Sequence, residues 1–121
     1  MTEGTKATGS WGERVARAHL ERRGYRIREM NYRCPYGEID IVAEHGDWLV
    51  FVEVRTRRSR SFGTPEESVT ARKAEHLRSA VEHYCQNHAG LPAAWRIDLL
   101  ALEVGPGGRV QRIAHIENAI S

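Results

Sequence analysis

The chain has 121 residues, of which 40% are hydrophobic and 28% are charged, and its formal net charge at pH 7 is +2. This length suits a single domain with one core, and so small a net charge does not by itself indicate any class of partner. The longest apolar run, from Trp48 to Val52, is far shorter than the roughly 20 residues of a membrane span. Two cysteines without a Cys-x-x-Cys pair indicate neither a zinc knuckle nor a disulfide framework. We therefore expect a cytoplasmic protein that does not associate with membranes.

The N-terminal part of the chain predicts a tail followed by a helix. Residues 1–9 are polar and rich in Gly and Thr, which is typical of a disordered segment ahead of a single domain over residues 10–121. Ser10 and Glu13 have the spacing of a capping box, in which each side chain accepts a backbone N–H from the other residue. A helix is therefore predicted from Ser10 to Gly24, a residue type that commonly ends helices.

The rest of the chain predicts five strands and a second helix. Turn residues separate extended segments over 25–33, 37–44 and 47–55, and an apolar stripe at helical spacing follows over 71–88. Two more strands are expected after that helix, over 95–104 and 109–116. Tight turns make the first three strands an antiparallel meander, and the helical crossover makes the fourth strand a parallel neighbour of the third. The sequence thus predicts an α/β domain, α-β-β-β-α-β-β, with a mixed five-stranded sheet.

The third predicted strand places a carboxylate inside an apolar segment. Residues 48–54 are apolar apart from Glu53, as expected of a central strand that is covered on both faces. If residues 46–47 form a two-residue hairpin loop, Asp40 lies directly opposite Glu53. A loop one residue earlier places Glu38 opposite Glu53 instead. Either register crowds two negative charges onto one face of the hairpin, which is destabilising.

Three arrangements can neutralise such a pair of carboxylates. One carboxyl can hold a proton, Arg55 can complete a structural Asp-Glu-Arg network, or a divalent cation can bind both acids. Mg²⁺ suits the third arrangement, because it needs only one or two carboxylates and completes its shell with water and phosphate. The residues alone leave all three arrangements open.

The spacing of these residues resembles the catalytic hairpin of the restriction-endonuclease-like (PD-(D/E)xK) nucleases, in which an acid on one strand precedes Glu-x-Lys on the next. Here the corresponding residues are Asp40 and then Glu53-Val54-Arg55. Longer strings are similar to the small bacterial YraN family of that superfamily, among them GEIDIVA at 37–43, LVFVEVR at 49–55, RIDLLAL at 96–102 and HIENA at 115–119. The resemblance implies a restriction-endonuclease-like three-layer fold, similar to Holliday-junction-resolvase-like nucleases.

The same resemblance implies an activity and a set of roles. The expected activity is that of a Mg²⁺- or Mn²⁺-dependent endonuclease, in which metal-activated water attacks a phosphodiester of DNA, with branched or nicked DNA among the candidate substrates. Asp40, Glu53 and the backbone carbonyl of Val54 would hold the metal, and Glu13 would assist through water or a second metal.

Arg55 stands where the superfamily has its signature lysine. An arginine can stabilise negative charge, but it is not deprotonated in proteins and is a poor base. Lys73, in the first turn of the second predicted helix, is a candidate to replace that lysine. Both residues are therefore predicted to act on the scissile phosphate.

Arginine dominates the basic residues, because Lys6 and Lys73 are the only lysines among the 18. Arginine favours bidentate contacts with phosphate. The arginines close to the predicted hairpin are candidate nucleic-acid contacts: Arg33, Arg57, Arg58 and Arg60. Two alternatives stay open, a catalytically inactive nucleic-acid-binding module of the same fold and a protein-interaction module. A homodimer is compatible with each of them.

Overall fold

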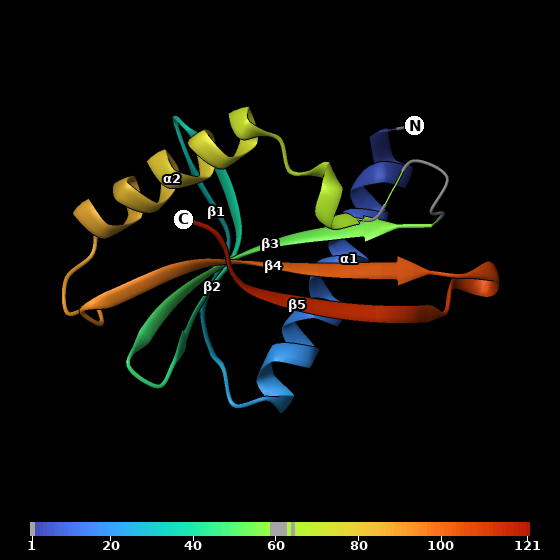
Figure 1. The fold of residues 1–121 in the computed structure, drawn as a ribbon, viewed down its shortest axis with the longest axis horizontal. Helices are drawn as coiled ribbons and strands as arrows, with labels where there is room; N and C mark the ends of the chain where they lie inside the picture. The colour runs from blue at the N-terminus through green and yellow to red at the C-terminus, as the bar shows by residue number, and fades with distance from the viewer. Residues whose placement is uncertain (1, 59–62, 64) are drawn as a thin grey trace.

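The computed structural model describes residues 2–58, 63 and 65–121, with the side chains of residues 10–58, 63 and 66–121. The elements follow one another in the order helix, three strands, helix, two strands, with short 3-10 helices before α2 and before β5 (Figure 1). Their bounds are α1 Thr2–Arg22, β1 Arg26–Cys34, β2 Gly37–His45, β3 Trp48–Arg57, η1 Pro65–Ser68, α2 Ala71–Gln86, β4 Ala94–Val104, η2 Pro106–Gly108 and β5 Val110–Ile120. The predicted order of elements is confirmed.

The described strands form one five-stranded sheet in the order β1-β2-β3-β4-β5. Strands β1, β2 and β3 pair antiparallel, β4 pairs parallel to β3, and β5 pairs antiparallel to β4. The predicted α/β class and mixed topology are therefore confirmed. Strand β3 is central because α2 carries the chain back to lay β4 along its far side.

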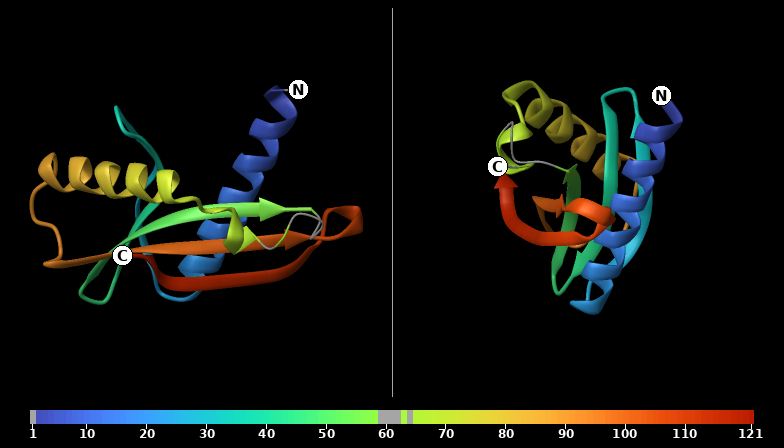
Figure 2. Two further views of the ribbon diagram at one scale, coloured as in Figure 1. Left: turned by 45° about the horizontal axis from the view of Figure 1, so that its top comes forward. Right: turned by 90° about the vertical axis from the view of Figure 1, so that its right-hand side faces the viewer.

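The two α-helices cover opposite faces of the sheet, which gives three layers (Figure 2). On one face Leu77 and Tyr84 of α2 pack with Phe51 of β3. On the other face Leu20 of α1 packs with Val52 of the same strand. Neither helix, within the part of the chain that the structure describes, is long and apolar enough to cross a bilayer.

The predicted start of the first helix was wrong, because α1 begins at Thr2 and not at Ser10. Extending an existing helix is easier than nucleating one, and no proline between Thr2 and Ser10 stops the extension from the packed part of α1. The Ser10–Glu13 spacing therefore lies inside a helix and does not begin one. The second helix does begin at a cap, since the Thr70 hydroxyl accepts the backbone N–H of Lys73 at 3.1 Å.

The β2–β3 hairpin adopts the first of the two predicted registers. His45 pairs with Trp48 across a loop of residues 46–47, and the described ladder continues to the pair Ile41–Val52. This pairing excludes the alternative register.

Beyond that pair the two strands part. Both continue, β2 back to Gly37 and β3 on to Arg57, but the described ladder between them ends at Ile41. Asp40 on β2 and Glu53 on β3 lie immediately beyond the pair Ile41–Val52, so they face each other where the strands separate. This opening positions the candidate site.

Candidate metal centre

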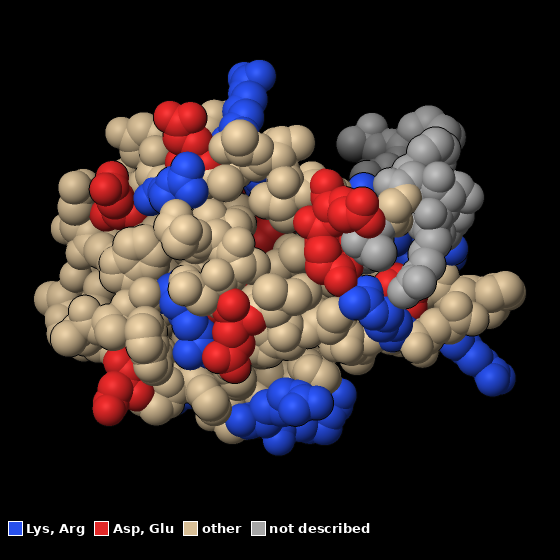
Figure 3. All heavy atoms as spheres, in the orientation of Figure 1, with Lys and Arg blue, Asp and Glu red and all other residues tan. Residues whose placement is uncertain are grey.

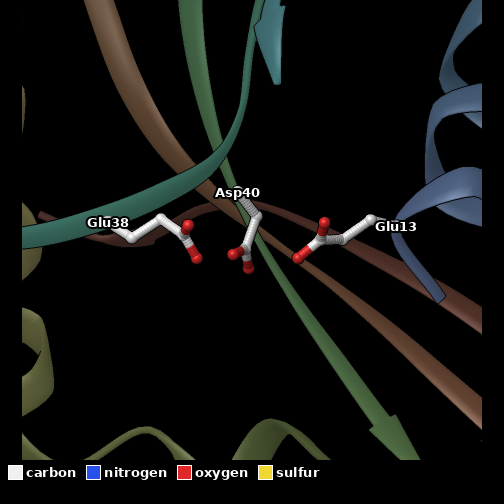
Figure 4. Close-up of side chains that lie close together, drawn as sticks. All are labelled: Glu13, Glu38 and Asp40. Atoms are coloured by element: carbon white, nitrogen blue, oxygen red, sulfur yellow. The ribbon is translucent and has the colours of Figure 1, made fainter. Parts of the chain in front are cut away.

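Three carboxylates from α1 and β2 converge beside the opening between β2 and β3. One oxygen each from Glu13, Glu38 and Asp40 lie within 4.8 Å of one another, and all three residues are half-buried. The side chain of Asp40 lies between the other two, with Glu13 reaching in from α1 (Figure 4). Carboxylate oxygens are the ligands that Mg²⁺ and similar hard cations take in proteins. These three residues, which we call the acidic cluster, could therefore hold a divalent cation.

A close approach of α1 to β3 brings Glu13 to this cluster. A Cβ atom on Gly12 would collide with the Thr56 hydroxyl, so the helix can lie against the strand only because this residue has no side chain. The next residue is Glu13, and its Oε1 accepts a hydrogen bond from Asn31 Nδ2 at 2.8 Å. Helix α1 and strand β1 together hold this carboxylate in place.

The sequence-based prediction missed Glu38 as a member of the cluster. It treated Glu38 only as the residue that would replace Asp40 in another register. Residues two apart on a strand point to the same side, and that spacing was a signal that both acids belong to one site. Arg33 pairs with Glu38 at 3.1 Å, and its side chain is otherwise exposed.

Asp40 is the most perturbed member of the cluster. Burial raises the pKa of Asp40, and the negative charges of Glu53, Glu13 and Glu38 raise it further. A hydrogen bond from Val54 lowers this pKa, but the net result is a value of about 8. In that bond the backbone N–H of Val54 donates to Asp40 Oδ2 at 2.8 Å. This N–H lies beyond the last described pair of the β2–β3 ladder, Ile41–Val52. Without a cation nearby, Asp40 therefore holds a proton at neutral pH.

Glu53 is neutralised differently. Its side chain is only 5% exposed, and its Oε2 lies 3.1 Å from Arg55 Nη2 and 3.7 Å from Lys73 Nζ. Its Oε1 has no hydrogen-bond partner among the described residues, and neither has the buried Nε of Arg55. A buried carboxylate oxygen without a partner is costly. Asp40 thus matches the expected arrangement in which one carboxyl holds a proton, while Glu53 is paired with Arg55 and Lys73.

The structure brings all five predicted catalytic residues into one neighbourhood, namely Glu13, Asp40, Glu53, Arg55 and Lys73. Lys73, from the first turn of α2, approaches the same carboxylate oxygen as Arg55. The catalytic roles of these residues stay predictions. So does the role of Val54 as a metal ligand through its carbonyl, since the structure shows its N–H as a donor to Asp40.

The predicted nucleic-acid contacts lie around this neighbourhood. Arg57 and Arg58, at the end of β3, line an open pocket of about 440 Å³. Arg57 is four residues beyond Glu53, roughly 13 Å along an extended strand. Arg60 lies outside the described residues. On the face that carries α2, acidic and basic side chains are interspersed, and a large acidic group lies over η1, which contains Glu66 and Glu67 (Figure 3).

Comparison with known proteins places the chain in a family. Residues 12–102 match the model of the family described as "Uncharacterised protein family UPF0102". The chain belongs to the UPF0102 family. It is 45% identical over 117 residues to a UPF0102 protein of Moorella thermoacetica, which covers 97% of this chain and 95% of the relative. It is 43% identical over 114 residues to a UPF0102 protein of Dehalococcoides mccartyi, which covers 93% and 94%.

The segment of this UPF0102 chain that matches the family model begins immediately before Glu13 and includes Lys73. It therefore spans the whole acidic cluster and both cations that approach Glu53. Three of the strings that resemble a nuclease family lie within this segment, namely GEIDIVA, LVFVEVR and RIDLLAL. The fourth, HIENA at 115–119, lies beyond it.

The raised pKa of Asp40 predicts how stability depends on pH. Its folded-state pKa of about 8 exceeds the ordinary value of 3.8, so folding binds a proton and stability falls as the pH rises between these values. One group contributes at most about 1.4 kcal/mol per pH unit, and partial exposure of Asp40 reduces this. Asp40→Asn keeps an acceptor for the Val54 N–H and cannot ionise. In metal-free urea unfolding, the free energy of unfolding of this variant should rise relative to that of the wild type as the pH rises from about 5 to 8.

The control for this measurement is Asp47→Asn, a neutralisation in the exposed β2–β3 loop. It should shift the stability of the protein by a similar amount at pH 5 and at pH 8. A difference between Asp40→Asn and the wild type that does not change with pH would contradict the raised pKa.

The contacts of Glu53 predict a weak dependence of the fold on its charge. Arg55 and Lys73 are 29% and 36% exposed, so water can solvate them when Glu53 is neutralised. Metal-free Glu53→Gln should therefore cost less than the 3–5 kcal/mol that follows the breaking of a fully buried pair, about 2 kcal/mol or less. Urea unfolding of Glu53→Gln, Arg55→Gln and the double variant measures this. Costs of about 3–5 kcal/mol for both single changes, largely recovered in the double variant, would show that the pair serves the fold.

Proposed function

We propose that this UPF0102 protein is a Mg²⁺- or Mn²⁺-dependent endonuclease that acts on DNA. The observation that carries the proposal is the position of Glu53, which lies between carboxylates that can hold a cation and two side-chain cations that can meet a phosphate. Hydrolysis of a phosphodiester needs both kinds of group, because negative charge must be neutralised as water attacks.

The residues present fit a divalent cation. Three carboxylate oxygens lie within 4.8 Å of one another, and the buried Oε1 of Glu53 lacks a hydrogen-bond partner among the described residues. Asp40 carries a proton that a cation would displace. We infer that Asp40 and Glu53 hold the cation, with Glu13 and Glu38 beside them and the carbonyl of Val54 as a further ligand. A bound Mg²⁺ or Mn²⁺ lowers the pKa of a water ligand and polarises a phosphoryl oxygen.

The chain's own groups have separate tasks in this proposal. The Val54 N–H fixes the orientation of the Asp40 carboxylate through its hydrogen bond. Arg55 and Lys73 are partly exposed, so a substrate phosphate can reach them and exchange their contact with Glu53 for one with phosphate oxygens. Arg55 supplies a planar guanidinium with a permanent charge, whereas Lys73 supplies the compact ammonium of a lysine. Lys73 therefore takes the part of the lysine that is absent at position 55.

The proposed nucleic-acid contacts are the arginines predicted from the sequence, Arg33, Arg57, Arg58 and Arg60. Arg33 is exposed beside the acidic cluster, and Arg57 and Arg58 line an open pocket further along β3. On the α2 face acidic and basic groups are interspersed, so that face offers DNA no continuous basic surface (Figure 3). Phosphate contacts of this kind position the backbone without reading its sequence.

One observation favours a second candidate function. Arg55 and Lys73 already neutralise one oxygen of Glu53 without a metal. A catalytically inactive nucleic-acid-binding module of the same fold would keep such a contact and lose turnover. The two candidates differ in cleavage, not in the fold.

The experiment combines Mn²⁺ calorimetry with a cleavage assay on linear, flapped and four-way DNA. Because Asp40 must lose its proton, the affinity for Mn²⁺ should rise about tenfold per pH unit below pH 8. Lys73→Ala should still bind Mn²⁺, at least as tightly as the wild type because one competing cation leaves Glu53, but it should cleave about 10²-fold more slowly. Its matched control is Arg72→Ala, an exposed cation in the same turn of α2, which should change neither.

Each result separates the candidates. Cleavage that requires Mn²⁺ and Lys73 supports the endonuclease. Mn²⁺ binding and DNA binding without cleavage of any substrate would overturn the endonuclease and leave the binding module. Absence of Mn²⁺ binding at millimolar concentration would overturn the metal centre itself.

A further inference from the structure

A pocket of about 420 Å³ lies at the C-terminal end of α1, away from the acidic cluster. Six of its lining residues carry polar groups: His19, Arg23, Tyr25, His45, His115 and Glu117. His19 lies six residues after Glu13, which is about 9 Å further along the helix axis. None of these six residues belongs to the proposed metal centre.

The wall formed by β4 and β5 is built around a fully buried carboxylate, Asp98. Asp98 accepts hydrogen bonds from Arg96 Nε at 3.0 Å, from the backbone N–H of Asn118 at 2.9 Å and from His115 Nε2 at 2.8 Å. Nε2 of His115 donates to Asp98, so its other ring nitrogen, Nδ1, which no described residue bonds, can donate to an anion when the ring is the imidazolium. These residues lie in the strings RIDLLAL and HIENA, which contribute no residue to the proposed nuclease site.

The opposite wall gathers further donors. Tyr25 stacks on His45 with ring centroids 4.0 Å apart, and its ring lies 5.6 Å from that of His115. Arg23 Nε donates to His19 Nε2 at 2.9 Å. A guanidinium gains more from a charged oxygen than from a neutral ring nitrogen. This hydrogen bond is therefore one that an anion would replace.

Among the described lining residues of this pocket, basic side chains outnumber acidic ones. Burial lowers the pKa of His19, and the nearby charges of Arg23, His115 and Arg22 lower it further. Among the described lining residues Glu117 is the one acid, and its side chain is 63% exposed and lies 3.9 Å from Arg96. A bound anion would act on the pKa of His19 in the opposite direction, because it would favour the imidazolium form of His19 and pair with the guanidinium of Arg23.

We propose that this pocket binds a phosphate-type oxyanion, with Arg23, His19 and His115 as its donors. A planar guanidinium can hold two oxygens of such an anion at once. The anion is either free phosphate or a backbone phosphate of a nucleic acid, which present the same oxygens. The site uses no metal and no residue of the acidic cluster, so it does not depend on the proposed nuclease activity.

Sulfate is the probe for this site, because its charge does not change between about pH 5 and 8. Bound sulfate stabilises the imidazolium form, so the pKa of His19, followed by NMR, should rise by about one unit. By linkage, sulfate should bind about tenfold more tightly to the protein in which His19 is protonated. Other charged and titratable groups also surround His19. They are Arg22 and Arg23 near the end of α1, Tyr25, His45 on β2, Arg96 and Asp98 on β4, and His115 and Glu117 on β5.

The variant that tests the donors is Arg23→Gln, an exposed position whose change leaves the Asp98 network intact. It should weaken sulfate binding about tenfold. The control is Arg17→Gln on the same helix, which breaks only an exposed pair with Glu21 and should leave sulfate binding unchanged. A His19 pKa that ignores sulfate, or equal binding by the wild type and Arg23→Gln, would overturn the site.

Competition then distinguishes the source of the anion, in metal-free buffer so that the nuclease proposal is not involved. Inorganic phosphate should displace sulfate from the pocket. A single-stranded oligodeoxynucleotide that displaces sulfate equally well, with the same His19 response, assigns the pocket to a nucleic-acid backbone. Displacement by inorganic phosphate alone assigns it to a free phosphate. Failure of phosphate to displace sulfate would contradict the proposed ligand class.

Discussion

Asp40 and Glu53 face each other between two layers of helix, at the point where β2 and β3 part, and neither carboxylate can be left charged and alone. The structure resolves this with two different neutralisations. A proton stays on Asp40 because its pKa is raised to about 8, while Glu53 is placed against Arg55 and Lys73. The separation of the strands makes the arrangement feasible, because it frees the Val54 N–H to bond Asp40. In the proposed function a divalent cation would displace the proton of Asp40, and a substrate phosphate would take over the contacts of Arg55 and Lys73.

Each layer of the fold supplies a different part of this site. The sheet supplies the two facing carboxylates, α1 adds the acid Glu13 where Gly12 allows it to lie against β3, and α2 adds the cation Lys73 from the other face. The two helices therefore add groups of opposite charge to the sheet opening, Glu13 from α1 and Lys73 from α2. Helix α1 also reaches the histidine pocket at its other end. One rigid helix thus spans the proposed metal centre and the proposed anion site.

The sequence predicted the parts of this fold that depend on local chemistry. The Gly-Asp turn at 46–47 gave one of the two registers expected for β2 and β3, and it is the register that the structure adopts, while hydrophobic periodicity was enough to place Lys73 in the first turn of α2. The start of α1 was wrong because Ser10 lies in a helix that extends past it. Glu38 was missed although its spacing from Asp40 puts both acids on one side of β2, and the parting of the strands beside them leaves no mark in the sequence. The bond between Asp98 and His115 depends on a β4–β5 pairing with an irregular register, which residue patterns do not specify.

The central claim is that the opening between β2 and β3 is a divalent-metal site, and anomalous diffraction from crystals soaked in Mn²⁺ tests it most directly. The account predicts an anomalous peak in direct contact with the carboxylate of Asp40 and with at least one oxygen of Glu53, Glu13 or Glu38. Crystals of Asp40→Asn treated in the same way should lack that peak. A wild-type crystal at millimolar Mn²⁺ with no peak at Asp40, and with Glu53 still bound only to Arg55 and Lys73, would contradict the account.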